Sequence, residues 1–241
     1  MMRALETEEI AKRNGVVFIK TLIAIPCMST IHTDFAQCFT AMRRVGETRF
    51  GMTKCTLIHD ARNEFASRAI TEGYDRVLWL DSDMVFHPDL MERLSADMDA
   101  GRDYVCGLCF KRCLPTAPVL YSHIGESKTT PGLYEAEIYK DYPRDTIFEV
   151  EGSGFGAVMT TVELLKRVWD RYGPPFYYHN NLGEDLSFCY RVKQIGASMW
   201  CDASAKVGHI GNVVFDEKMY DWQLANWEFV RATASGECGK E

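Results

Sequence analysis

The chain has 241 residues, of which 46% are hydrophobic and 25% are charged, and this balance excludes disordered, collagen-like and fibrous proteins. Lysine and arginine number 27 against 34 acidic residues, and the net charge of −7 gives no sequence-wide positive field that would hold DNA or RNA. A nucleic-acid partner would therefore need a local basic patch. The length suits one domain with one core.

The cellular compartment is indicated by the apolar stretches and the cysteines. The longest apolar stretch, Val16–Met28, is too short to span a bilayer, and the acid-rich start of the chain does not resemble a secretory signal. Nine cysteines are scattered along the chain, which suits reduced thiols. Cys106, Cys109 and Cys113 have a spacing seen in zinc sites, but no second pair matches them. We expect a soluble cytoplasmic protein without a transmembrane segment, with buried thiols rather than a zinc site.

The first half of the sequence alternates between strand and helix patterns. Runs of β-branched residues indicate buried strands, and apolar residues three and four positions apart, ended by glycine, indicate helices. The expected elements are a strand from Val16 to Ile25, a helix from Thr56 to Glu72, a strand from Val77 to Leu80, a helix that Pro88 opens and Gly101 ends, and a strand from Tyr104 to Phe110. The alternation predicts an α/β fold of the Rossmann-like kind, with central parallel strands flanked by helices.

The second half has shorter elements separated by Gly, Ser, Thr and Pro, as in a mixed sheet joined to the first half. A last amphipathic helix is indicated by Met219, Trp222, Ala225 and Phe229, before a loose tail. The other expected elements are strands over Val119–Ile124, Leu133–Tyr139 and Phe148–Met159, and helices over Val162–Tyr172 and Glu184–Ile195. No Pro- or Ser-rich linker marks a boundary, so residues 1–241 are predicted to form a single domain.

Two carboxylates, Asp81 and Asp83, follow the predicted strand that ends at Leu80. Ligands of open α/β sheets bind beyond the carboxyl ends of the strands, and paired carboxylates there can hold a divalent cation together with phosphate oxygens. The same spelling recurs in Asp97-Met98-Asp99, where a solvated helix face is expected. The alternative for Asp81 and Asp83 is a turn and helix-capping role.

Several short motifs occur in order along the chain, and their order and spacing carry more weight than any one of them. They are Ile25-Pro26, Ala61-Arg62-Asn63, Leu80-Asp81-Ser82-Asp83, Gly152-Ser153-Gly154-Phe155-Gly156, Gly183-Glu184-Asp185 and Gly208-His209-Ile210-Gly211. Over about residues 16 to 215 the chain resembles nucleotide-sugar glycosyltransferases of the GT-A fold, particularly the family 2 group. With Lys111-Arg112 and Pro115 to Pro118, it is similar to compact members carried by bacteriophages and prophages.

The resemblance implies how the single domain is divided and where a donor binds. It implies a nucleotide-sugar half over about 16–117, an acceptor half over about 118–215, and a C-terminal helix and tail over 216–241. The implied donor is a nucleoside-diphosphate sugar, with a UDP-sugar as first choice. The acidic residue that contacts the nucleobase in many members has no counterpart in Gly46–Thr53, so the base stays open. The implied donor-binding residues are Pro26, Cys27, Arg62, Asn63, Asp81 and Ser82.

The resemblance also implies a metal ion and a general base. Mn²⁺ or Mg²⁺ would be held by Asp83 and His209, with Asp81 on the ribose or on the metal through water, and would act as a Lewis acid on the leaving diphosphate. Asp185 would take the proton of the acceptor hydroxyl, with Glu184 in support, and the anomeric centre would invert. A helix start should favour the ionised form of Asp185.

Each of these residues also has a purely structural interpretation. Glu184 and Asp185 suit the start of any helix, because acidic side chains there complement the helix dipole. A lone histidine in a glycine-flanked turn, such as His209, is more often structural than a ligand. Arg62 is interpreted about equally well as a charge on a helix surface.

The acceptor side is less defined. Gly154 in the glycine-rich strand would admit a substrate close to the backbone, or the glycines could mark a bulged strand. Phe155 and Trp200 would offer the substrate stacking faces, as Tyr177 and Tyr178 also could, although aromatic residues at such density are more often core. The acceptor could be a glycan, a protein, a small molecule or a hydroxylated base in phage DNA, for which Lys111-Arg112, Lys128 and Arg144 would form the basic strip. The C-terminal helix is predicted to pack on the domain and to close over the donor after binding.

Two other functions compete with glycosyl transfer. A sugar-nucleotide-forming nucleotidyltransferase would share the α/β half and the carboxylates, but it needs a glycine-rich basic loop after the first strand. The chain has Pro26-Cys27-Met28-Ser29-Thr30 there, which lacks both glycine and base. A non-catalytic nucleotide-sugar binding module would keep the pocket without turnover.

Overall fold

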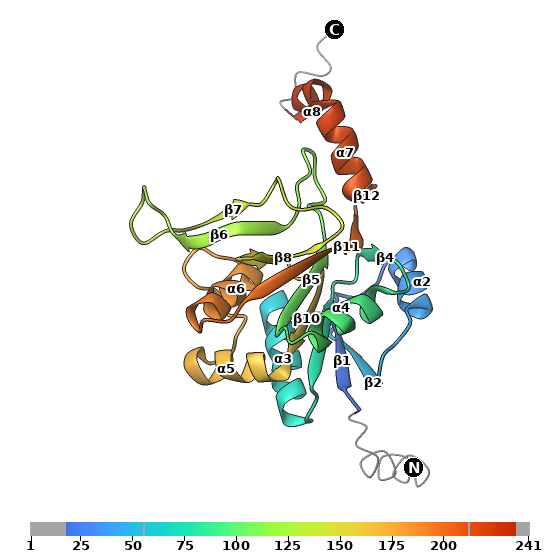
Figure 1. Ribbon diagram of the computed structural model, residues 1–241, viewed down its shortest axis with the longest axis vertical. Helices are drawn as coiled ribbons and strands as arrows, with labels where there is room; N and C mark the ends of the chain where they lie inside the picture. The colour runs from blue at the N-terminus through green and yellow to red at the C-terminus, as the bar shows by residue number, and fades with distance from the viewer. Residues whose placement is uncertain (1–17, 55, 212, 235–241) are drawn as a thin grey trace.

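The computed structural model describes residues 18–54, 56–211 and 213–234 (Figure 1). The start of the first predicted strand, at Val16 and Val17, and the tail from residue 235 lie outside them. Within this described part, nine strands join one large sheet. In chain order they are β1 (Lys20–Ile25), β2 (Glu47–Met52), β3 (Arg76–Leu80), β4 (Met84–Phe86), β5 (Tyr104–Leu108), β8 (Ile147–Val150), β10 (Ala157–Thr161), β11 (Met199–Ile210) and β12 (Val214–Phe215).

The order across the large sheet is β12-β11-β5-β10-β3-β1-β2, with β4 and β8 paired to β11. β2, β1 and β3 pair in parallel, and so do β5 and β11. β10 lies between β3 and β5 and is antiparallel to both, so β3 and β5 run in the same direction. The strands β2, β1, β3, β5 and β11 are therefore all parallel to one another. The prediction of an α/β fold with central parallel strands flanked by helices is confirmed.

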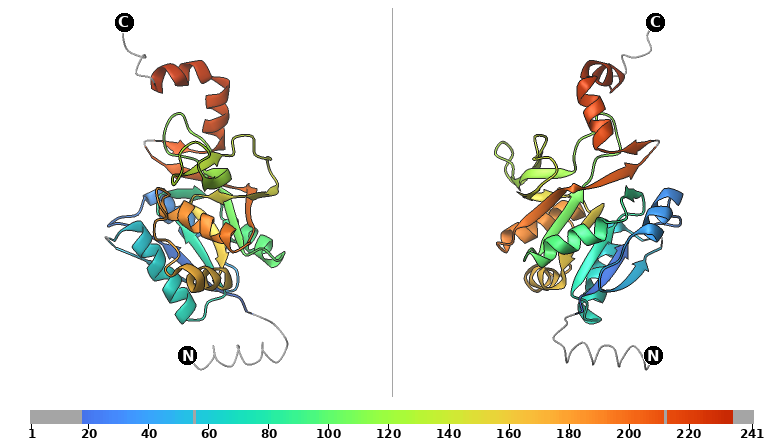
Figure 2. Two further views of the ribbon diagram at one scale, coloured as in Figure 1. Left: turned by 90° about the vertical axis from the view of Figure 1, so that its left-hand side faces the viewer. Right: turned by 45° about the vertical axis from the view of Figure 1, so that its right-hand side comes forward.

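Helices cover both faces of this sheet because its strands are apolar on both sides. In β3, Val77 and Trp79 join the core cluster under one layer of helices, while Leu78 and Leu80 join the cluster under the other. The first layer holds α3 (Ile58–Thr71), α5 (Val162–Tyr172) and α6 (Glu184–Gln194), and the second holds α2 (Thr33–Ala41) and α4 (Leu90–Asp99) (Figures 1 and 2). Neither α2 nor β2 is predicted from the sequence; β2 is an edge strand whose residues are all partly or fully exposed, so it lacks an apolar run.

Aromatic rings fill the core between α3, α6 and the sheet. Phe155 packs against Trp79 with ring centroids 5.8 Å apart, and against Phe176 at 5.1 Å. Phe176 stacks on Phe188 of α6 at 4.8 Å. Edge-to-face and stacked pairs of this kind contribute about 0.5–1.5 kcal/mol each beyond burial. The Trp79 indole also donates to Thr160 Oγ1 at 3.0 Å, which satisfies its buried N–H.

The single strand predicted over Phe148–Met159 is wrong, because the chain changes sheets within it. It divides into β8, β9 (Gly152–Ser153) and β10. β9 belongs to a small sheet of order β7-β6-β9, with β6 (Leu120–Glu126) and β7 (Tyr134–Ile138). A Cβ on Gly154 would lie 2.6 Å from Val119 Cγ1, so glycine is what lets the crossing chain pass so close to its neighbour.

The C-terminal region differs most from prediction. The single expected helix is two helices, α7 (Glu217–Ala225) and α8 (Trp227–Ala234), which extend from the end of the domain beside β12 (Figures 1 and 2). The buried face of α7 is formed by Glu217, Tyr220 and Gln223, whereas the predicted anchor Trp222 is 44% exposed. The Phe229 side chain lies outside the described residues. In the part of the chain that is described, no helix has the length and apolarity needed to cross a membrane.

Candidate active site

A polar cavity of about 360 Å³ lies at the sheet edge where β1 and β3 end. Six of the residues that the sequence assigned to donor and metal line it, because the strand order brings their segments together. They are Pro26 and Cys27 after β1, Asp81, Ser82 and Asp83 after β3, and His209 near the end of β11. Thr53 and Thr56, which follow β2, complete the wall and were not predicted. The volume is in the range of small-molecule sites.

Asp83 and His209 meet because β11 pairs antiparallel with β4, directly after Asp83. His209 Nε2 lies 3.2 Å from Asp83 Oδ2, and His209 Nδ1 lies 3.0 Å from the carbonyl oxygen of Phe110. That carbonyl can only accept, so Nδ1 donates to it. Nε2 then either carries a proton that it donates to Asp83, or presents a lone pair that requires a cation between it and the carboxylate.

This pair therefore fits a divalent cation chemically, since an imidazole fixed by a backbone carbonyl is a common arrangement for a metal ligand. Among the residues that the structure describes, no group of three or more His, Cys, Asp or Glu side chains is placed to hold a metal ion. Any further ligands would have to come from a substrate or from water. Burial tends to raise the pKa of Asp83, but its hydrogen bond to His209 and the charge of Arg112 outweigh burial and lower it.

Arg112 is a candidate residue that the sequence did not assign to the site. It lies on the loop after β5, with its side chain 58% exposed, and Nη1 contacts Asp83 Oδ2 at 2.7 Å. The sequence did hold a signal for Arg112, because this basic residue follows a strand that ends at the same sheet edge. Its guanidinium now neutralises the carboxylate that a cation would otherwise bind.

Arg62 forms ion pairs with both acidic motifs, through Asp81 and Glu184. It rises from α3 with its side chain 3% exposed, and it donates from Nη1 to Glu184 Oε1 at 2.6 Å and from Nη2 to Asp81 Oδ1 at 3.0 Å. The guanidinium lies 5.0 Å from the centre of the Phe155 ring. Burial alone would lower its pKa, but Asp81 and Glu184 raise it, so Arg62 stays charged. The alternative of a helix-surface charge is excluded by this burial.

Asp185 lies at the N-terminus of α6, beside the glycine-rich segment before β10. Its Oδ1 accepts from the backbone N–H of Leu186 at 2.7 Å, and its Oδ2 lies 3.7 Å from the point where Gly154 would carry a Cβ. Burial raises the pKa of Asp185 to about 6, with the charge of Glu184 adding and that of Arg62 opposing. Burial thus outweighs the helix start, which was expected to favour the ionised form. A carboxylate with this pKa is ionised at neutral pH and still basic enough to accept a proton.

Tyr121 is a second residue that the sequence did not single out. It lies on β6, half-buried, and burial together with the charge of Asp185 raises its pKa to about 12. The phenol therefore stays protonated beside the carboxylate.

Phe155, Trp200 and Asn63, which were predicted to bind donor or acceptor, make structural contacts instead and do not line the cavity. Phe155 is 2% exposed beneath Arg62, so its ring is no stacking face. Trp200 lies at the opposite end of β11, paired with Val105 at the start of β5, and its ring is covered by Arg102 at 4.8 Å. Asn63 is buried and accepts from the backbone N–H of Phe176 at 2.9 Å, which fixes the loop before α6.

Two further expectations concern the cysteines and the basic strip. Cys106 and Cys109 are buried free thiols, as expected, and Cys113 is exposed. Arg144 does not extend a free basic patch, because it pairs with Glu217 and with Asp221 at 2.9 Å.

Comparison with known proteins locates the fold. No protein-family model matches the sequence, and no curated protein matches it. Among solved structures, the crystal structure of A197 from STIV is similar, with a TM-score of 0.57 and 19% sequence identity over 80% of this chain and 86% of that chain. At this level of identity the likeness shows the fold.

Proposed function

We propose that the protein is a metal-dependent glycosyltransferase of the GT-A type, which transfers a sugar from a nucleoside-diphosphate sugar to an acceptor hydroxyl with inversion. The observation that carries the proposal is the Asp83–His209 pair, in which Nε2 lies 3.2 Å from a carboxylate oxygen at the carboxyl end of the sheet. The fold, shared with A197 from STIV over most of both chains, supports it.

Asp83 and His209 are the residues that would hold Mn²⁺ or Mg²⁺. When bound, such an ion stabilises negative charge on the leaving diphosphate without any proton transfer. The resident counter-charge, Arg112, has an exposed side chain and is free to move from Asp83 to the phosphates of a donor. A UDP-sugar is the proposed donor, with its nucleoside between Pro26, Cys27 and Thr53.

In the transfer step, Asp185 Oδ2 accepts the proton of the acceptor hydroxyl. The acceptor oxygen forms a bond to the anomeric carbon from the face opposite the diphosphate. The bond from that carbon to the diphosphate oxygen breaks, and its electron pair leaves with the nucleoside diphosphate. Gly154 has no side chain to cover Oδ2, so an acceptor hydroxyl can approach it.

Arg62 serves as the positioning residue for both halves of this step. It holds Asp81 on the donor side and Glu184, the neighbour of Asp185, with one buried guanidinium. A fixed distance between the donor phosphates and the base is what orients the reacting atoms.

The product of turnover tests the proposal. The protein is incubated with UDP-glucose and other nucleotide sugars in Mn²⁺, and free nucleoside diphosphate is measured. Release of nucleoside diphosphate that stops with EDTA supports glycosyl transfer or slow hydrolysis by the same machinery. Pyrophosphate-dependent exchange would instead identify a nucleotidyltransferase, and tight binding without turnover would identify a binding module.

The natural acceptor is sought separately. Mass analysis of glycans, proteins and DNA from cells that express the wild type or Asp185→Asn would show which class of molecule gains a sugar only with the wild type.

A further inference from the structure

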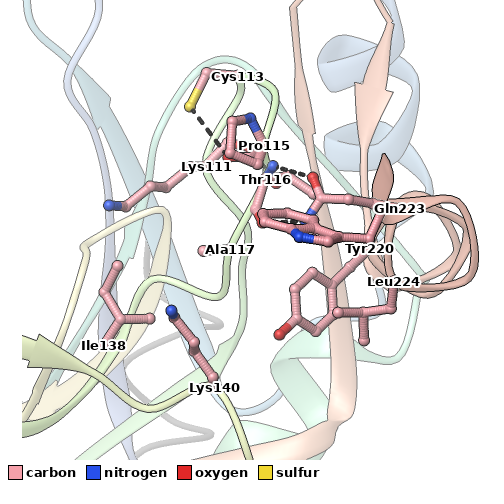
Figure 3. A pocket seen from close by; sticks show the side chains of 11 residues that line it. Lys111, Cys113, Pro115, Thr116, Ala117, Ile138, Lys140, Tyr220, Gln223 and Leu224 are labelled. Carbon is pink, nitrogen blue, oxygen red and sulfur yellow. Dashed lines mark hydrogen bonds between the residues drawn. The ribbon is translucent and has the colours of Figure 1, made fainter. Parts of the chain in front are cut away.

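The larger cavity of the described residues lies away from the motifs, between the loop after β5 and helices α7 and α8 (Figure 3). Its volume is about 650 Å³, and most of its lining is apolar. Pro115 forms one wall, Tyr220 and Leu224 form the facing wall, and Ile138 lies at the base. Trp227 also lines the cavity. Leu224 and Trp227 are 52% and 47% exposed, which are large apolar surfaces to leave beside an open cavity.

The cavity wall is held in place by specific contacts. The buried Gln223 side chain accepts from the backbone N–H of Thr116 and donates to the carbonyl oxygen of Thr116 at 2.8 Å. Tyr220 packs on Phe110 with ring centroids 5.5 Å apart. Helix α7 and the loop after β5 are therefore joined by specific contacts.

Two lysine side chains belong to the lining of this apolar space. Lys111 on the loop and Lys140 just after β7 both line the cavity (Figure 3). Within the described residues, neither has a hydrogen-bonded or ion-paired acidic partner, although acidic side chains outnumber basic ones in this chain. By contrast, Lys193 and Lys206 each pair with glutamate. Two unpaired ammonium groups beside apolar walls are complementary to a ligand with an apolar body and an anionic group.

The cavity adjoins both sides of the proposed reaction centre. Ile138 lies directly opposite Tyr121 in the pairing of β6 with β7, so both side chains stand on one face of the small sheet. Tyr121 is near enough to Asp185 to feel its charge. On the other side, Lys111 precedes Arg112, which contacts Asp83. Lining residues of the cavity are thus direct neighbours of Tyr121 on the side of the base and of Arg112 on the side of the donor.

We infer that this cavity binds the acceptor, and that the acceptor is an amphiphile with an apolar body and an anionic group held by Lys111 and Lys140. The acceptor role rests on the proposed function, whereas the binding of an anionic amphiphile does not. No arginine lines the cavity, so the anion is held by point charges rather than by a planar fork, as lysines hold phosphate or sulfonate groups.

The inference is tested with two fluorescent probes that share one apolar body. 8-Anilino-1-naphthalenesulfonate carries a sulfonate, and N-phenyl-1-naphthylamine does not. In the double variant Lys111→Gln/Lys140→Gln, we expect the affinity for the sulfonate to fall about five- to tenfold, as two partly exposed charge pairs would give. The affinity for the neutral probe should change less than about twofold.

Matched variants separate this site from general surface binding. Leu224→Ala should weaken both probes, because it removes apolar wall, and Lys166→Gln on the exposed face of α5 should weaken neither. Thermal melts establish that each variant is folded. Equal losses for both probes in the lysine variant, or the same loss with Lys166→Gln, would overturn the inference.

The acceptor role is tested by inhibition. The sulfonate probe should inhibit release of UDP from UDP-glucose in the wild type, and the double lysine variant should need about five- to tenfold more probe for the same fractional inhibition. Full occupancy of the cavity without inhibition would remove the acceptor role. If the wild type neither binds UDP nor releases it, the proposed function fails and the acceptor role with it, while lysine-dependent probe binding would still identify an anionic amphiphile site.

Discussion

Two cavities, the one that holds Asp83 and His209 and the one between α7, α8 and the loop after β5, differ in how their walls are built. The smaller cavity is polar, and its residues come from strand ends that the hydrogen bonds of the large sheet place side by side. The larger cavity is mostly apolar, and one of its walls consists of α7 and α8, which reach the loop after β5 through Gln223 and Tyr220. The charged side chains thus lie on the rigid sheet, whereas a peripheral pair of helices determines the shape of the apolar cavity.

The largest expected effect would come from removing the base. Asp185→Asn keeps the shape of the side chain but cannot take a proton, so the rate of transfer should fall about 10²–10⁴-fold, the usual contribution of a general base. UDP affinity should stay within about twofold of wild type, because Asp185 does not line the polar cavity. Steady-state kinetics and calorimetry measure the two quantities. Turnover equal to wild type would remove Asp185 from this role.

The next largest effect is expected from replacing Arg62, which pairs with both acidic motifs. Arg62→Met leaves the partly buried carboxylates of Asp81 and Glu184 without a counter-charge, and the free energy of unfolding should fall by about 2–3 kcal/mol at neutral pH, below the range for fully buried pairs. Arg68→Met, which breaks an exposed pair with Glu72 on the same helix, should cost less than about 1 kcal/mol. Urea denaturation of both variants measures the difference. Similar losses of unfolding free energy in the two variants would mean that the ion pairs of Arg62 stabilise the fold no more than an exposed pair does.

The pKa of Asp185 gives a prediction in which activity and stability move in opposite directions with pH. As the pH falls below about 6 the base becomes protonated, so kcat/KM should fall about tenfold per pH unit. The folded-state pKa lies above the ordinary value of 3.8, so the stabilising effect of the protonated form is complete below pH 3.8 and is lost as the pH rises through about 6.

Asp185→Asn should therefore be more stable than wild type at pH 8, by about 2–3 kcal/mol, and about equally stable below pH 4. Thermal and urea unfolding across this range provide the check. A variant that is less stable than wild type at pH 8 would show that the ionised carboxylate is favourably held.

The smallest effect tests the attachment of the apolar wall. Gln223→Met fills the same space but leaves the N–H and carbonyl of Thr116 without their partners, which should cost about 1–3 kcal/mol. Amide hydrogen exchange at Thr116 should become faster, and probe binding to the larger cavity should weaken, while UDP affinity stays unchanged. Gln194→Met at the exposed end of α6 is the matched control. Unaltered exchange at Thr116 would contradict this attachment.

Much of the polar site could be predicted because its residues follow strands. Asp81 and Asp83 come directly after a fully buried run, so their place at a sheet edge follows from the strand itself. The contact of Asp83 with His209 was implied only by family resemblance, since the residues between them form several elements whose pairing the sequence does not reveal. Arg62 could not be resolved between surface and interior, because its burial depends on where α6 packs.

The failures have equally definite causes. Trp200 was assigned to the site without knowledge of β11, a strand of twelve residues in which Trp200 and His209 lie near opposite ends. Phe155 was considered as a stacking face, yet its ring packs against Phe176 in the aromatic core, so the structural interpretation holds for it. The C-terminal helix was predicted from its apolar residues. Two of the side chains that hold α7 in place, Gln223 and Glu217, are polar and gave no such signal.

The central claim is that a divalent cation between Asp83 and His209 brings a nucleotide to the sheet edge, and calorimetric titration with UDP tests it directly. Wild-type protein should bind UDP in the presence of Mn²⁺ and lose at least about tenfold in affinity when EDTA replaces the metal. His209→Ala should show the weaker affinity under both conditions. UDP binding that is the same with and without metal, or unchanged in His209→Ala, would contradict the claim.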